Sequence, residues 1–184
     1  MTVDPGVREA MLAAVPGLRA FAISLSGNVD RADDLVQETL LRALANIDSF
    51  EPGTNMSAWL FTILRNLFRS EYRKRRREVE DGDGRLAGNL KSQAEQPSHL
   101  EFEEFRTALS KLPPDQREAL ILVGASGFSY EEAAQICDSA VGTIKSRVNR
   151  ARTRLAQLLN IEDVREIGPD SATQAVLTGQ DAVK

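Results

Sequence analysis

The sequence predicts an all-α protein made of two small helical domains joined by a flexible linker. Apolar residues recur every three or four positions through most of the chain, which is the spacing of one helix face. No segment shows the strict alternation of apolar and polar residues that marks a half-buried strand. A polar, glycine-containing stretch from about Asp81 to Ser98 lacks apolar periodicity and separates two groups of helical segments. We therefore expect two domains, each with a modest core.

The first two helices are predicted before residue 50. One is expected over residues 7–26, but Pro16 and Gly17 interrupt it, and an interior proline removes a backbone N–H and clashes with the preceding turn. A kink or a break is expected there. Asp30, with Asp33 three residues later, predicts the N-cap and first-turn acid of the second helix. The buried face of that helix is expected to contain Leu35, Val36, Leu40, Ala43, Leu44 and Ile47.

A third helix is expected to begin near Met56 or Ser57. The preceding loop, residues 50–55, contains proline and glycine, which favour turns. The apolar side of the helix extends to Tyr72, and the helix is expected to dissolve into the basic run Arg73–Arg77.

Four more helices are predicted after the linker. The prolines at 113–114 end the first of them, and Asp115 followed by Glu118 predicts a cap for the next, which ends at Gly124 or Gly127. We place the domain boundaries at residues 1–80 for the first domain, 81–100 for the linker, 101–161 for the second domain and 162–184 for a loose tail.

The last two helices fit a helix-turn-helix. Ser129 and Glu132 have the Ser-x-x-Glu spacing of a capping box, which predicts a short helix that ends at Cys137. Residues 138–139 are expected to supply a turn and a cap. The final helix, residues 140–159, turns Val141, Ile144, Val148, Ala151, Leu155 and Leu158 inward. In such a motif the second helix lies in the major groove of DNA.

Charge is strongly segregated although the net charge is only −4. Residues 65–77 hold seven basic side chains against one acid, and residues 141–161 hold five against none, whereas residues 78–104 carry a net charge of −6. Two basic patches separated by an acidic stretch are typical of a protein that contacts nucleic acid at two places.

Other function classes are poorly supported. Cys137 and His99 are the single cysteine and histidine, so one chain assembles neither a disulfide framework nor a Cys/His metal site, and no nucleophile–base spacing is present. We expect no enzyme activity, cofactor, metal or small-molecule substrate. No uncharged apolar run approaches the ~20 residues of a membrane span, and the first residues lack signal-peptide features, so a cytoplasmic protein without membrane contact is expected.

The outer face of the final helix is the predicted DNA reader. Lys145, Ser146 and Asn149 lie near its start and are expected to reach base edges, whereas the later arginines suit phosphates. A lone basic helix is more often an ordinary solvated face, but solvated helices usually mix both signs, and this stretch has no acid. The candidate residues are Thr143, Lys145, Ser146, Arg147, Asn149, Arg150 and Arg152.

Four stretches carry a family resemblance. Asp33–Leu44, Trp59–Asn66, Ser129–Ala134 and Gly142–Arg152 resemble, in this order, the conserved regions 2 and 4 of the extracytoplasmic-function sigma factors. The resemblance extends from about Val7 to Leu159. Within that family, residues 18–27 and 50–55 are similar to the EcfG-type general stress sigma factors of alphaproteobacteria.

The resemblance implies roles for residues of the first domain. Core RNA polymerase is expected to bind Asp34, Gln37, Glu38 and Arg42, although periodicity alone would make these a solvated face. The minus-10 promoter element is expected to contact Thr54, Asn55, Ser57, Trp59, Arg65, Asn66, Arg69, Arg73 and Lys74. A lone tryptophan is more often a core residue than a stacking platform. Ser70 stands where many members have an acid.

The expected function follows from that resemblance. The chain should direct core polymerase to specific promoters through minus-10 and minus-35 elements, help open the DNA, serve stress-response genes and bind an anti-sigma factor. The alternatives are a sigma-like decoy that sequesters an anti-sigma factor, and a helix-turn-helix regulator that acts without polymerase. Under the sigma interpretation, Arg147→Ala and Arg150→Ala should both weaken minus-35 binding and lower its salt dependence.

Overall fold

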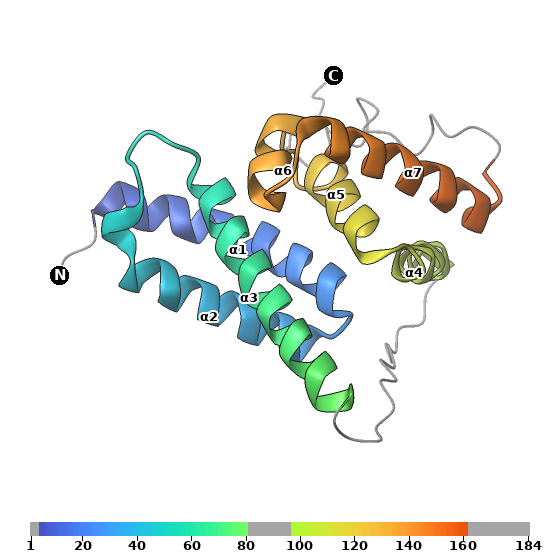
Figure 1. The fold of residues 1–184 in the computed structure, drawn as a ribbon, viewed down its shortest axis with the longest axis horizontal. Helices are drawn as coiled ribbons and strands as arrows, with labels where there is room; N and C mark the ends of the chain where they lie inside the picture. Colours follow the sequence, from blue (N-terminus) through green and yellow to red (C-terminus); the bar gives the residue numbers. More distant parts are fainter. Residues whose placement is uncertain (1–3, 81–96, 162–184) are drawn as a thin grey trace. The chain divides into compact units, whose positions relative to one another are not determined.

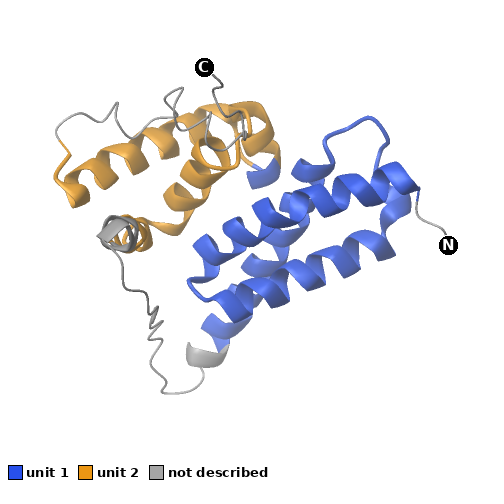
Figure 2. Ribbon diagram, turned by 180° about the vertical axis from the view of Figure 1, so that it is seen from behind, with its two compact units in different colours: residues 1–93, 136–138 blue, residues 94–135, 139–184 orange. Residues whose placement is uncertain are grey.

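The computed structural model describes residues 4–80 and 97–161, which form seven α-helices and one short 3-10 helix. The chain divides into two compact units, residues 1–93 with 136–138 and residues 94–135 with 139–184 (Figure 2). No strand occurs among the described residues, and the all-α prediction is confirmed.

The first unit is a bundle of three long helices. These are α1 (Pro5–Ser26), α2 (Val29–Ala45) and α3 (Met56–Glu80), with the 3-10 helix η1 (Ile47–Ser49) after α2 (Figure 1). All three helices contact one another. The fully buried side chains at their centre are Leu18, Phe21, Leu35, Leu60 and Leu64, and each contributes roughly 1.5–3 kcal/mol by leaving water. The rings of Phe21 and Phe61 stack at 5.1 Å.

Of the kink or break expected at Pro16, the break does not occur, because α1 is continuous across this residue. The side chains of Leu18 and Phe21, just after the proline, have no exposed surface, and their packing offsets the lost backbone hydrogen bond. Gly17 faces the ring of Phe61, because an added Cβ would lie 3.5 Å from it. The helix ends at Gly27, whose φ of 67° is the left-handed conformation that glycine adopts without a Cβ penalty.

By length and composition alone, α1 is apolar enough to span a membrane. The sequence did not lead us to expect this, because it contains no uncharged apolar run of that length. The core helix of a soluble protein and a signal sequence near an N-terminus satisfy the same requirement. Six of its side chains, Met11, Ala14, Leu18, Phe21, Ala22 and Leu25, are buried in the structure.

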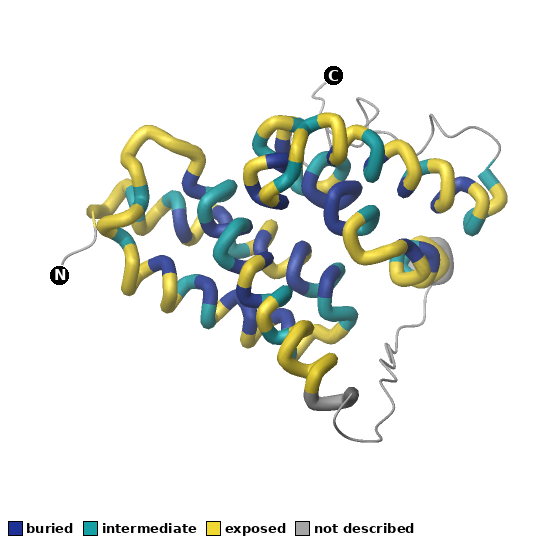
Figure 3. The backbone as a smooth tube through the Cα atoms, in the orientation of Figure 1, coloured by how far each residue is buried: buried dark blue, intermediate teal, exposed yellow. Residues whose placement is uncertain are grey.

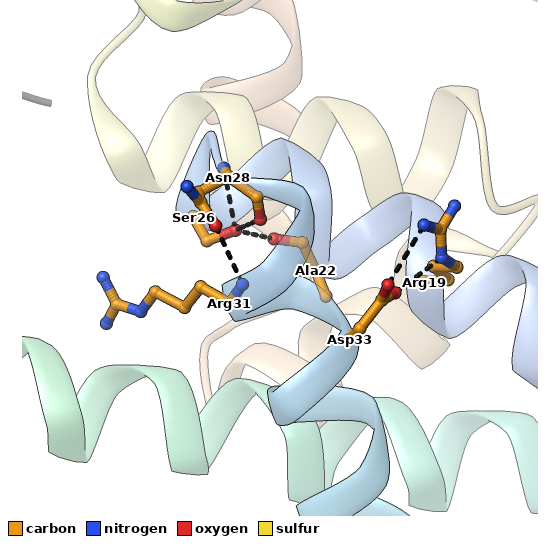
Figure 4. Close-up of polar contacts among 6 residues, drawn as sticks. All are labelled: Arg19, Ala22, Ser26, Asn28, Arg31 and Asp33. Atoms are coloured by element: carbon orange, nitrogen blue, oxygen red, sulfur yellow. Dashed lines mark hydrogen bonds and ion pairs between the residues drawn. The ribbon is translucent and has the colours of Figure 1, made fainter. Parts of the chain in front are cut away.

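Helix α2 begins two residues earlier than predicted. Asn28, and not Asp30, is the N-cap, since its side-chain oxygen accepts a hydrogen bond from the Arg31 N–H at 2.8 Å (Figure 4). Asp33 pairs instead with Arg19 of α1 through two contacts of 2.6 and 3.2 Å. This guanidinium lowers the pKa of the Asp33 carboxyl, and the carboxylate in turn raises the pKa of Arg19.

The buried face of α2 differs from the prediction at several positions. Leu44 is 44% exposed, Leu40 is only partly buried, and the partly buried Ile47 belongs to η1. In contrast, Ala32 and the polar Thr39 are fully buried. Thr39 satisfies its hydroxyl by donating to the Leu35 carbonyl one turn earlier, so burial leaves no unpaired donor.

Helix α3 begins at Met56, as predicted, but it does not dissolve at the basic run. It continues to Glu80, so Arg73–Arg77 project from a regular helix. Arginine and lysine have high helix propensity, and the like charges are all exposed to water, which screens their repulsion.

The second unit contains α4 (Pro97–Ser110), α5 (Pro114–Gly124), α6 (Tyr130–Cys137) as far as Gln135, and α7 (Val141–Leu159). Helix α7 packs on both α4 and α5, and Leu122, Ile144, Val148 and Leu155 have no exposed surface. Along α7, buried and exposed positions alternate with the helical period (Figure 3). Helix α4 already begins at Pro97; the rest of the expected linker, 81–96, and the tail, 162–184, lie outside the described residues.

The predicted capping box of α6 is confirmed. The Ser129 hydroxyl accepts from the Glu132 N–H at 3.1 Å, and the Glu132 carboxylate accepts from the Ser129 N–H at 2.9 Å. Two other predicted caps are wrong. Pro113 and Ala140 occupy the N-cap positions of α5 and α7 without side-chain hydrogen bonds. Asp115 and Ser139 are therefore available for contacts elsewhere.

Candidate functional site

The four residues expected to bind polymerase lie together on one groove. Its volume is about 440 Å³, and it runs between α2 and α3. The lining residues are Asp34, Gln37, Glu38, Leu41, Arg42, Leu67, Ser70, Glu71 and Lys74. Residues three and four apart on a helix share a face, which explains how α2 presents its four members side by side.

Apolar and charged side chains both line the groove. Leu41 is 56% exposed, and Leu12 and Leu44 of the same unit are exposed as well, so this leucine alone does not mark a site. Glu38 and Arg42 form an ion pair of 2.8 Å along α2, and Arg31 joins α2 to α3 through Glu71 at 3.2 Å. The Arg31 guanidinium also lies over the Phe68 ring, 5.4 Å from its centre. Such a surface suits a protein helix that brings both apolar and charged side chains.

The residues expected to contact the minus-10 element separate on α3. Asn66, Arg69 and Arg73 follow the helical period along the side opposite the core. Lys74 points to another side of the helix and lines the groove with Asp34 and Glu38. Arg65 is only 4% exposed and makes an interaction of its own, so its guanidinium is not displayed to solvent in this structure.

The loop before α3 is held by its own backbone. Thr54 donates its hydroxyl to the Glu51 carbonyl at 2.7 Å, and Gly53 takes a φ of 91° to complete the turn. The Asn55 side chain accepts from the Ala58 N–H at 3.2 Å, which caps α3. Thr54 and Asn55 are exposed, and Ser57 beside them is half-buried.

Trp59 is neither in the core nor fully displayed. It is half-buried, and its ring lies 5.2 Å from the Phe50 ring at a tilt of 46°. One face of the indole is therefore occupied by a residue of the loop before α3. A ring fixed in this way can support an unstacked base with little loss of side-chain entropy.

Helices α6 and α7 form the predicted helix-turn-helix. Asp138, in the turn, has a φ of 48°, and the Ser139 N–H bonds to the Ala134 carbonyl at 3.0 Å, closing the end of α6. The inner side of α7 is buried at Ile144, Val148, Ala151 and Leu155. Its outer face therefore presents Thr143, Ser146, Asn149 and Arg150, in agreement with the period of the sequence.

A second groove, of about 450 Å³, lies beside this outer face. It is lined by Pro113, Gln116, Asn149, Arg150, Thr153, Arg154 and Gln157, which come from the start of α5 and from α7. Thr153 and Gln157 extend the row of Asn149 and Arg150 by one and two turns, so the helical period was a usable signal for them. Gln116 belongs to another helix, and no local pattern linked it to the site.

Two of the predicted DNA-binding cations are engaged within the unit. Arg147 donates to the Asp115 carboxylate at 3.2 Å and to the Ser139 hydroxyl at 3.4 Å. The Lys145 ammonium lies 5.6 Å from the centre of the Tyr130 ring. Arg152 is half-buried, and its Nε has no hydrogen-bond partner. Burial also lowers the pKa of Arg117 in α5.

No group of three or more His, Cys, Asp or Glu residues placed to hold a metal ion occurs in residues 4–80 or 97–161. Cys137 is buried as a free thiol.

Comparison with known proteins connects both units to one family. Residues 11–78 match the family model Sigma-70 region 2, and residues 102–155 match Sigma-70, region 4. The ECF RNA polymerase sigma factor EcfG of Rhodopseudomonas palustris is 72% identical over 179 residues, which cover 97% of this chain and 99% of that protein. The chain belongs to the extracytoplasmic-function sigma factors.

Solved structures agree with this assignment. The sigma factor RpoE of Bartonella quintana, in complex with the anti-sigma factor NepR, is 56% identical with a TM-score of 0.79 and covers 85% of this sigma factor and 98% of that chain. The anti-anti-sigma factor PhyR of the same organism, also complexed with NepR, reaches a TM-score of 0.55 at 18% identity over 95% of this chain and 68% of that one. The likeness to PhyR shows the fold alone.

The function expected from the resemblance is thereby established at the level of the family. This sigma factor directs core RNA polymerase to specific promoters, with its region 2 in the first unit and its region 4 in the second.

Proposed function

We propose that the two units divide the work of a sigma factor among three surfaces. The groove between α2 and α3 binds core polymerase through Asp34, Gln37, Glu38 and Arg42. The outer face of α3 and the loop before it bind the minus-10 element. The outer face of α7 binds the minus-35 element. The observation that carries this proposal is that each set lies on a helix side turned away from the buried core.

For the minus-10 surface we propose a division between bases and backbone. Thr54, Asn55, Ser57 and Trp59 lie at the start of α3, where exposed polar groups adjoin a fixed ring, and they suit an unstacked base. Asn66, Arg69 and Arg73 lie further along the helix and suit phosphates. Lys74 is assigned to the polymerase groove that it lines, and buried Arg65 is left out of the DNA surface.

The remaining assignments rest on the family. The proposed domain limits are residues 1–80 and 101–161, with a tail at 162–184 and a connecting segment at 81–100, whose last residues, from Pro97, already belong to α4. The protein acts in the cytoplasm, without enzyme activity of its own, on stress-response promoters. An anti-sigma factor regulates it, which is supported by the complex of the 56% identical RpoE with NepR.

Reconstitution with core polymerase tests the function as a whole. Adding this chain to core enzyme should produce specific run-off transcripts from a subset of genomic fragments, and core enzyme alone should produce none. A decoy for an anti-sigma factor predicts the opposite result: no specific transcript from any fragment and tight binding of the chain to an anti-sigma protein.

The polymerase groove has its own test. Asp34→Ala should weaken binding to core polymerase roughly fivefold, about 1 kcal/mol, the upper range for an exposed charged contact. Asp48 is an exposed acid of the same unit outside the groove, and Asp48→Ala is the matched control with unchanged binding. Equal losses in both variants would contradict the placement of this surface.

A further inference from the structure

Two cations of α7 lie on opposite edges of the DNA-facing side, and each is held from within the unit. Lys145 is paired with the Tyr130 ring of α6 on one edge. Arg147, on the other edge, reaches Asp115 at the start of α5 and Ser139 in the turn between α6 and α7. The recognition helix is thus joined by side chains to α5, to α6 and to the turn between α6 and α7.

Arg154 provides an internal comparison for Arg147. The two arginines are seven residues apart, which is nearly two helical turns, so they share one edge of α7. Arg154 is exposed and forms no hydrogen bond or ion pair within residues 4–80 and 97–161, whereas the side chain of Arg147 is only 22% exposed. Arg154 therefore presents its charge to solvent, and Arg147 largely presents its charge to Asp115.

We propose that Asp115 and Arg147 are a positioning pair that fixes the rotation of α7 about its own axis. The guanidinium fork holds two separate elements at once, the first turn of α5 and the helix-turn-helix turn. Rotation of α7 would carry Ser146 and Asn149 away from the base edges, and Arg150 away from the phosphates, that they are proposed to contact. This inference rests on the proposed contact of α7 with the minus-35 element.

For Asp115→Ala, a positioning role predicts a different effect on DNA binding from the one that charge alone predicts. Removing an acid near a DNA-binding face should strengthen binding to every DNA sequence, because the phosphates are anionic. Loss of a positioning residue should instead reduce the preference for the correct element. The salt dependence of binding distinguishes two roles for Arg147. A phosphate contact contributes to this dependence, whereas a positioning residue does not.

The experiment uses holoenzyme reconstituted from core polymerase and the full chain. One DNA fragment carries a promoter identified by run-off transcription, and a second is identical except for a scrambled minus-35 element. The ratio of the two affinities measures discrimination, and the dependence of affinity on salt gives the number of phosphate contacts. The variants are Asp115→Ala, Arg147→Ala, Arg147→Lys and the double Asp115→Ala/Arg147→Ala.

Two matched controls remove the same charges elsewhere in the unit. Glu131→Ala removes an exposed acid from α6, and Arg154→Ala removes an arginine from the same edge of α7. Helix content and thermal unfolding are measured for every variant. Arg147→Lys keeps the positive charge and loses the fork, so it tests the pair even where Arg147→Ala lowers stability.

We expect Asp115→Ala and Arg147→Ala each to reduce discrimination about three- to tenfold, the range for residues that share one hydrogen-bond network. The double variant should lose no more than either single variant, and Arg147→Lys should resemble Arg147→Ala. The salt slope should fall by about 0.9 for Arg154→Ala. For Arg147→Ala it should stay constant, in contrast to the decrease that the sequence alone led us to expect. Glu131→Ala should leave discrimination unchanged.

Three results would overturn the pair. The first is that Arg147→Ala lowers the salt slope as Arg154→Ala does, while Arg147→Lys stays fully active. The second is that Asp115→Ala raises the affinity for both fragments equally. The third is that the losses of discrimination in the two single variants add up in the double variant. If wild-type holoenzyme failed to distinguish the two fragments, the proposed minus-35 contact itself would be wrong, and this outcome is separate from the other three.

Discussion

The cations of α3 and those of α7 lie at different positions relative to the buried residues of their helices. In α3 the last buried residue is Leu67, and Arg73–Arg77 extend beyond it as an exposed run. In α7 the buried residues continue from Ile144 to Ala156, and the cations alternate with them on the same turns. The cations of α3 thus project past their unit, whereas those of α7 are fixed along a packed scaffold.

This difference implies two ways of using positive charge. An exposed run beyond the core attracts phosphates wherever they lie, and its contributions should be additive and sensitive to salt. Cations placed along a packed helix can contact DNA only when the helix has the correct orientation. Their contributions to binding should therefore be coupled to the residues that hold the helix in that orientation. The basic run of α3 is therefore suited to non-specific attraction of phosphates, and the cations of α7 are suited to contacts that depend on the orientation of the helix.

The comparison assumes that each unit depends on its own core, and the largest predicted effect tests this assumption. Leu155→Ala should lower the free energy of unfolding of the C-terminal unit by about 2–5 kcal/mol, because the buried leucine leaves a cavity. Leu60→Ala should do the same to the N-terminal unit. Trp59, the single tryptophan, reports the N-terminal unit by fluorescence, and circular dichroism reports both.

Urea titrations distinguish the outcomes. With Leu155→Ala the fluorescence midpoint should stay at the wild-type value while part of the dichroism change moves to lower urea. A common shift of both signals would show that the two units unfold together and would remove the basis of the comparison.

The caps of the two units give a smaller predicted effect. Ser129→Ala should destabilise the C-terminal unit by about 1 kcal/mol, since it removes one of two reciprocal hydrogen bonds at the start of an eight-residue helix. Asn28→Ala, which removes a single bond from the much longer α2, should cost the N-terminal unit less. Thermal unfolding of both variants, with Ser129→Thr as the control that keeps a hydroxyl, measures the difference. Equal losses would argue against a greater dependence of the short helix on its cap.

The smallest effect concerns the Arg19–Asp33 pair, whose side chains are 47% and 51% exposed. Arg19 lowers the pKa of Asp33, so the folded chain binds this proton less readily than the unfolded chain. The stability that the pair adds is therefore present at neutral pH and is lost as the pH falls below the ordinary range of an aspartate, through the lowered folded pKa.

Asp33→Asn should reduce the slope of stability against pH between about pH 5 and about pH 2.5, where carboxylates titrate. The measurement is the urea midpoint of the fluorescence transition at each pH. Asp30→Asn changes an exposed acid of the same helix and is the matched control. If the urea midpoint changed with pH in the same way in both variants, the Arg19–Asp33 ion pair would make no specific contribution to stability.

Much of this molecule followed from local sequence patterns. The all-α class, the start of α3 at Met56, the capping box at Ser129 and the inner face of α7 were all predicted, because each depends on residues within one or two turns of one another. Local patterns also misled where two explanations competed. Asp30 and Asn28 are both good caps, and the buried helix neighbours of Pro16 outweighed its preference for a break.

The sequence by itself determined the helices, their inner faces and the concentration of positive charge on two of them, since these are properties of composition and period. Only the tertiary structure decided which neighbour each charged side chain meets. Arg147 and Asp115 are separated by 32 residues, Arg31 and Glu71 by 40, and Lys74 lines a groove made by another helix. Such contacts depend on how the helices cross, which no local period encodes. They distinguish a cation whose charge is exposed to solvent from one that is paired within its unit.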